Sequence, residues 1–128
     1  RFLKPLADAG VDIFHASNRR FWEPEFAGSN LNLAGWTKEI TGAPTITVGS
    51  VGLDVDFIES NFNMKHSGKA DSASARLEEL VQRFSRGEVD LVAVGRALLQ
   101  DPEWVRKIRD GRFSELSAYD RASIARLY

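Results

Sequence analysis

The feature that most constrains the fold is a repeated alternation between helical and strand patterns. Three runs are rich in β-branched and apolar residues, at 11–16, 43–49 and 89–95. A helical pattern precedes each run and ends at a glycine, at Gly10, Gly42 and Gly87 in turn. Strands separated by helices are joined by right-handed crossovers, which make neighbouring strands parallel. The sequence therefore predicts an α/β fold with a parallel sheet.

The helical patterns differ in strength, and the one at 74–87 is the clearest. Its apolar residues Leu77, Leu80, Val81 and Phe84 share one face, which is typical of an amphipathic helix. Asp101-Pro102 divides a pattern at 97–110, because Asp101 suits the N-cap and Pro102 the first helical position. Weaker patterns predict helices at 2–10, 31–42 and 117–127, and a short helix at 55–60 within an irregular tract at 50–74.

Three parallel strands leave sheet edges and apolar faces uncovered, which favours association. Two architectures fit the pattern: a small open sheet, or the last three units of an eight-stranded barrel. The chain opens inside a helical pattern and without an initiator methionine, so we expect the second. Residues 1–128 would then be the incomplete, C-terminal portion of one barrel domain, a partial (β/α)8 TIM barrel. We expect such a fragment to associate with itself.

Composition excludes several classes of function. The net charge of −1 provides no general excess of cations for a nucleic-acid partner. The absence of cysteine excludes disulfides, thiol catalysis and Cys-based metal sites. No apolar run is long enough to cross a membrane, and the first residues do not form a signal peptide. We therefore expect a soluble, cytoplasmic protein that acts on a small molecule, without a metal.

Two consecutive strands end in the same Val-Gly corner, at Gly49-Ser50 and at Gly95-Arg96. In parallel α/β folds, ligands lie at the carboxyl ends of the strands, where free amides and helix N-termini bind phosphate. Glycine lets the backbone approach the anion closely, and Arg96 would add a charge-assisted contact. An ordinary tight turn uses glycine in the same way, with Arg96 as a solvated helix-start residue. The spacing alone leaves both interpretations open.

At these corners the sequence resembles the flavin-dependent oxidoreductases of the old yellow enzyme type, also called NADH:flavin oxidoreductases. The matching stretches are "GVDIFHASNRRFWEPEF", "LNLAGWTKEITGAPTITVGSVGL" and "DLVAVGRALLQDPEWVRKIRDGR". The resemblance implies an FMN-binding (β/α)8 barrel, of which this chain supplies strands six to eight and a C-terminal helix. It also implies that the FMN phosphate is bound by Gly49, Ser50, Gly95 and Arg96.

The resemblance implies a parent enzyme in which NADH or NADPH reduces FMN. The flavin then passes hydride to an activated alkene or a related acceptor. The catalytic residues of that family precede the region matched here, so we expect none in this chain and no activity from it alone. Two alternatives stay open. One is a phosphate-binding barrel lyase or isomerase that acts on a sugar phosphate, and the other is a catalytically silent structural fragment.

Other residues with chemical potential lie near the first strand. His15 has no recognisable nucleophile beside it, so we expect a structural or rim position. The following loop contains Arg19, Arg20, Phe21 and Trp22. These residues would either shape the mouth of a barrel pocket or form a self-packed loop, in which an arginine pairs with Glu23 or Glu25.

Overall fold

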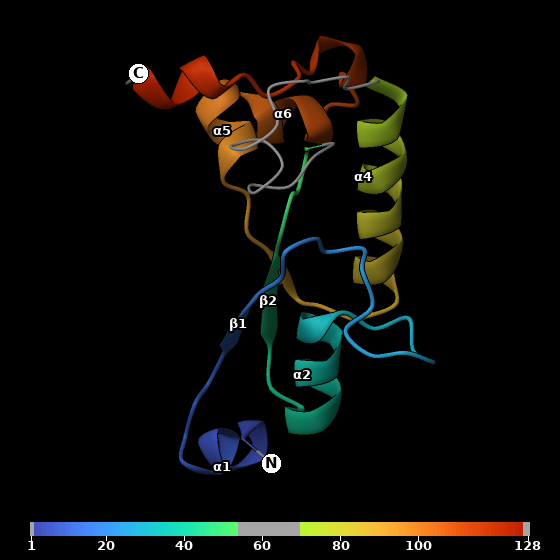
Figure 1. The fold of residues 1–128 in the computed structure, drawn as a ribbon, viewed down its shortest axis with the longest axis vertical. Helices are drawn as coiled ribbons and strands as arrows, with labels where there is room; N and C mark the ends of the chain where they lie inside the picture. The colour runs from blue at the N-terminus through green and yellow to red at the C-terminus, as the bar shows by residue number, and fades with distance from the viewer. Residues whose placement is uncertain (1, 54–69, 127–128) are drawn as a thin grey trace.

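The computed structural model describes residues 2–53 and 70–126, without the side chains of 70–75. Figure 1 shows the arrangement of its elements. The helices are α1 (Leu3–Asp8), α2 (Leu33–Thr41), α4 (Ala70–Ser85), α5 (Arg96–Gln100) and α6 (Trp104–Arg109). The strands are β1 (Phe14–Ser17), β2 (Thr45–Val48) and β3 (Leu91–Val92). Two 3-10 turns follow, at Phe113–Glu115 and Arg121–Ala125. The short helix expected at 55–60 lies outside the described residues.

The three strands form a parallel sheet in the order β1-β2-β3, in agreement with the alternation in the sequence. One face is covered: Ala16 of β1 packs with Ala34 of α2 and with Val89, and Thr47 beside it is fully buried. Both α2 and α4 lie on the same side of the strands (Figure 1). Residues on the opposite face are more open, and Leu91 is 52% exposed. The described helices therefore cover the sheet from one side.

The strands are shorter than the apolar runs that predict them. β1 begins at Phe14, whose amide donates to the Pro44 carbonyl at 3.0 Å. Val11 and Ile13, which the sequence assigns to this strand, lie outside it and are exposed. β3 spans only Leu91–Val92 within the predicted 89–95. β-propensity extends beyond these strands because it reports side-chain preference, whereas pairing needs a partner backbone.

Local capping explains two helix boundaries. α2 starts after Asn32, whose side-chain oxygen accepts from the Gly35 amide at 2.9 Å, so this helix begins later than predicted. It ends at Gly42, where φ is +69°. The predicted division at Asp101-Pro102 is present, but α6 begins only at Trp104. Asp101 accepts from the Glu103 amide at 3.0 Å and forms a turn between α5 and α6.

The residues that α4 buries differ in part from the apolar face that the sequence predicts. Leu77 and Leu80 are buried in the main core with Phe21, Val51, Ala97 and Trp104, as the pattern predicts. Val81 and Phe84 are 59% and 52% exposed, so only part of the predicted apolar face is buried among the described residues. Arg83 is instead 6% exposed. A pattern based on hydrophobicity does not predict a buried arginine. The free-energy cost of burying its charge is offset by hydrogen bonds to residues far away in the sequence.

The predicted helix at 117–127 is also wrong: the described part of this segment forms only the 3-10 turn Arg121–Ala125. The Asp120 amide donates to the side-chain oxygen of Gln100 at 3.0 Å, which ties the segment to α5. The Ser123 hydroxyl donates to the Asp120 carbonyl at 2.6 Å, so side-chain bonding competes with a regular helix. Among the described helices, none has the length and apolar character needed to cross a membrane.

Candidate phosphate-binding site

The carboxyl ends of the three strands meet around a pocket of about 380 Å³. All four residues predicted to bind the phosphate, Gly49, Ser50, Gly95 and Arg96, line this pocket. The other lining residues are Ser17, Asn18, Arg19, Val48, Val51, Leu53 and Ala93. The parallel register explains the convergence, because strands that run the same way end at the same edge of the sheet. The two Val-Gly corners therefore face one common space.

The corner at Gly49-Ser50 is shaped by the loop that follows β1. Gly49 has φ +139°, and a Cβ there would lie 2.5 Å from the carbonyl oxygen of Asn18. Ser50 has φ +51°, and its hydroxyl donates to the Arg19 carbonyl at 3.4 Å. The Phe21 amide donates to the Gly49 carbonyl at 3.1 Å. The missing side chain of Gly49 thus makes room for neighbouring backbone, which is a packing requirement and does not by itself indicate a ligand.

The corner at Gly95 is different. Its φ is −108° and its ψ is −93°, and a Cβ built there would meet no atom within 4 Å. Its carbonyl accepts from the Leu98 and Leu99 amides at 2.9 and 3.3 Å, at the start of α5. Packing therefore does not require glycine at this position. Open space beside the backbone is the condition for a ligand to approach the main chain closely.

The polar groups around the pocket favour an anion. Among the described residues, the amides of Gly49, Ser50 and Gly95 donate to no backbone carbonyl. Of the lining residues that the structure describes, Arg19 and Arg96 are charged and none carries a carboxylate. The Arg96 guanidinium also lies 5.5 Å from the centre of the Tyr119 ring, within the range of a cation–π contact. Amide donors and guanidinium groups are the common protein ligands of phosphate.

A third corner, at the end of β1, contributes Ser17, Asn18 and Arg19 to the pocket. The Asn18 side-chain amide donates to the Thr47 hydroxyl at 2.9 Å, and its Oδ1 is buried without a partner among the described residues. Arg19 belongs to the loop that the sequence suggested for the mouth of a pocket, whereas Ser17 and Asn18 were not predicted. Their signal was available, because both are polar residues at the end of a predicted strand.

The loop after β1 combines features of the two interpretations that the sequence left open, a self-packed loop and the mouth of a pocket. Phe21 is 1% exposed in the core, and the Trp22 ring lies edge-on to it, with centroids 5.1 Å apart. Arg20 pairs with Glu23 at 2.7 Å, as the self-packed loop predicts. Arg19 lines the pocket, as the pocket-mouth interpretation predicts. His15 is exposed on β1 and does not line this pocket.

The chain is similar to part of a known protein. Over 121 residues the chain is 30% identical to a Thermoanaerobacter brockii protein described as NADH oxidase. The alignment covers 88% of this chain and 15% of the relative, so the chain spans only a small part of that protein's length. No family model matches the sequence. The chain is thus similar to one part of a protein named for an oxidase activity.

Proposed function

We propose that the chain is part of an FMN-dependent oxidoreductase and that its pocket holds the phosphate end of FMN. One observation carries the proposal: both Val-Gly corners and two arginines, Arg19 and Arg96, line one and the same pocket at the strand ends. Backbone amides at strand ends and guanidinium groups are the groups with which proteins commonly bind a doubly charged phosphate. The likeness to a protein described as NADH oxidase supports redox chemistry with NADH over other uses of a phosphate site.

The one-sided packing supports a partial (β/α)8 barrel as the setting of this pocket. Parallel sheets are normally covered on both faces, by helices in open sheets or by closure around an interior in barrels. Here α2 packs on the face that carries Ala16 and Thr47. In a barrel, Ile46 and Leu91 on the other face would point to the interior. In an open, doubly wound sheet that face would instead need helices of its own.

The residues of this chain would bind and orient the cofactor. The amides of Ser50 and Gly95 would donate to phosphate oxygens, and Arg19 and Arg96 would balance the negative charge. The apolar lining residues, which include Val51 and Leu53, suit the carbon chain next to the phosphate. When bound, FMN would accept hydride from NADH or NADPH and deliver it to an activated alkene or a related acceptor. We assign no proton-transfer residue to this chain.

Replacement of Arg96 tests the proposed anchor. Arg96→Ala removes a charged donor, so we expect its FMN dissociation constant to rise by about tenfold or more, measured by quenching of flavin fluorescence. Arg109→Ala makes the same charge change on an exposed side chain of α6 outside the pocket, and should leave binding unchanged. Equal affinity in Arg96→Ala and wild type would contradict the proposal. Binding of a sugar phosphate but not of FMN would favour a lyase or isomerase.

A further inference from the structure

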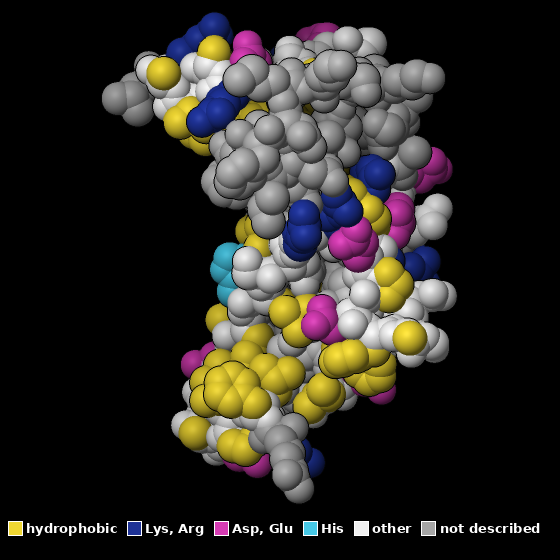
Figure 2. Space-filling view, in the orientation of Figure 1, with side chains coloured by type: hydrophobic (Ala, Val, Ile, Leu, Met, Phe, Trp, Pro, Cys, Tyr) yellow, Lys and Arg dark blue, Asp and Glu magenta, His cyan; other side chains and the backbone are white. Residues whose placement is uncertain are grey.

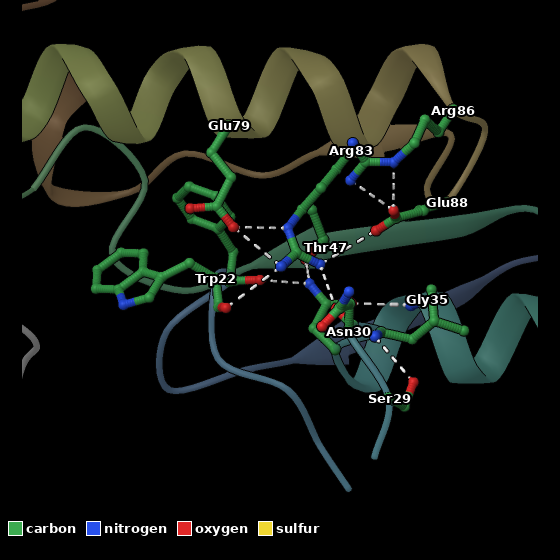
Figure 3. Close-up of polar contacts among 12 residues, drawn as sticks. Trp22, Ser29, Asn30, Gly35, Thr47, Glu79, Arg83, Arg86 and Glu88 are labelled. Atoms are coloured by element: carbon green, nitrogen blue, oxygen red, sulfur yellow. Dashed lines mark hydrogen bonds and ion pairs between the residues drawn. The ribbon is translucent and has the colours of Figure 1, made fainter. Parts of the chain in front are cut away.

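We infer that Arg83 is a positioning residue for the wall of the pocket, because it ties the loop after β1 to helix α4. Its effect on cofactor affinity rests on the proposed function, whereas its effect on the loop does not. Arg83 is 6% exposed, and its guanidinium lies between Glu79 and Glu88 (Figure 3). It donates to the carbonyl of Asn30 at 2.9 Å and to that of Trp22 at 3.3 Å.

The two carboxylates neutralise the charge of Arg83, and the loop carbonyls use the remaining donors. Glu79 accepts from Nε and Nη2 at 3.1 and 3.0 Å, and Glu88 accepts from Nη1 at 3.1 Å. A buried guanidinium is tolerated when its donors are all paired. Only the planar fork of arginine reaches both carboxylates and both carbonyls. The same side chain therefore stabilises α4 and fixes two points of the loop.

The fixed points are close to the pocket wall along the chain. Trp22 directly follows Phe21, whose amide donates to the Gly49 carbonyl at 3.1 Å. The Phe21 carbonyl accepts from the Asn32 side chain at 2.8 Å. Asn18 and Arg19, just before it, line the pocket. A shift of the Trp22 carbonyl would thus move Phe21. Because Phe21 is hydrogen-bonded to Gly49, this movement would also displace Gly49 and the backbone against which Gly49 packs.

Hydrogen exchange tests the positioning role without any ligand. Arg83→Lys keeps the charge but loses the fork, so the Phe21 amide should exchange about tenfold faster, as expected for the loss of one charged hydrogen bond. The Phe14 amide, at the other end of β1, should exchange at the wild-type rate. Arg86→Lys is the matched control, because Arg86 pairs with the same Glu88 but is 55% exposed. Unchanged exchange at Phe21 in Arg83→Lys would overturn the inference.

A second arm measures FMN affinity in the same variants. Arg83→Lys should bind FMN several-fold more weakly than wild type and Arg86→Lys equally well. If wild type binds no FMN, the proposed function fails, and the exchange result alone decides the role of Arg83. Should Arg83→Lys not fold, exchange in wild type under mild denaturant replaces it. The amides of Phe21 and Glu88 should then open together, and opening of Phe21 alone would contradict the coupling.

Discussion

At the scale of single residues, the two glycines of the Val-Gly corners occur in the same sequence context, but the physical role of glycine differs between the two positions. Gly49 combines φ +139° with a close approach to the Asn18 carbonyl, so any side chain there meets backbone. Gly95 has a negative φ and open space where its side chain would be. The first glycine is needed for the fold, and the second leaves room at the pocket. Substitution of Gly49 should therefore lower the stability of the fold, whereas substitution of Gly95 should affect the pocket and not the stability.

Gly49→Ala should lower the free energy of unfolding by about 3 kcal/mol or more, from backbone strain and overlap with Asn18. Gly42→Ala is a control for positive φ without overlap, since no atom lies within 4 Å of its Cβ, and should cost about 1 kcal/mol. Urea denaturation followed by circular dichroism measures both. A Gly49→Ala variant as stable as Gly42→Ala would show that the loop after β1 does not pack as described.

Gly95→Ala should change the free energy of unfolding by less than about 0.5 kcal/mol, because the added methyl group meets nothing. The same methyl group would occupy space beside the proposed phosphate, so FMN binding should weaken while stability is kept. Paired denaturation and FMN titration measure the two effects. Full FMN affinity in this variant would contradict a close approach of the phosphate to the Gly95 backbone.

At the scale of elements, Asp90 joins α2 and the sheet at the amino ends of the strands. Its carboxylate accepts from Lys38 Nζ of α2 at 2.7 Å and from the Thr45 amide of β2 at 2.8 Å. The hydrogen bond from Lys38, followed by that from the Thr45 amide, lowers the pKa of Asp90 below its ordinary value. The folded protein therefore binds the proton of this group less readily than the unfolded chain does.

Asp90→Asn should lower the free energy of unfolding by about 1 kcal/mol at neutral pH, a modest value because the side chain is partly exposed. The sign follows from linkage: a lowered pKa stabilises the fold above the unfolded value of about 4 and not below the folded value. The difference between wild type and variant should thus shrink as pH falls from about 4 through the folded pKa. A difference that stays constant down to pH 2 would contradict this assignment.

The sequence predicted elements well where a local pattern decides them. The parallel sheet, α2 and the buried residues Leu77 and Leu80 follow from periodicity and glycine stops. The convergence of the Val-Gly corners follows from strand direction. Distant partners decided the rest. Arg83 is buried because it donates to the carbonyls of Asn30 and Trp22, and the Gln100 side chain binds the segment predicted as the last helix. Such contacts leave no periodic signal.

At the scale of the whole molecule, large apolar surfaces are open among the described residues. An apolar groove of about 690 Å³ runs between α4, β3 and α6 and includes the exposed Val81 and Val105. Hydrophobic side chains also gather at the end of the molecule that carries α1 and α2 (Figure 2). Leu91 is exposed on β3, the strand at one edge of the sheet. Open apolar surfaces and strand edges favour association, so we propose that this 128-residue chain associates with itself.

Light scattering coupled to size exclusion tests this association. The apparent mass of wild type should rise with protein concentration. Leu91→Lys places a charge on the open edge strand, which should reduce the rise. Gln82→Lys adds the same charge at an exposed position of α4 and should behave as wild type. A wild-type chain that is monomeric at every concentration would contradict the proposal.

The central claim is that the pocket at the strand ends binds the phosphate of FMN. A comparison of FMN with riboflavin, which is the same flavin without the phosphate, tests it most directly by isothermal titration calorimetry. We predict that FMN binds at least about tenfold more tightly, and that this preference decreases with rising salt, because charged donors hold the phosphate. Equal affinities for FMN and riboflavin would contradict the account.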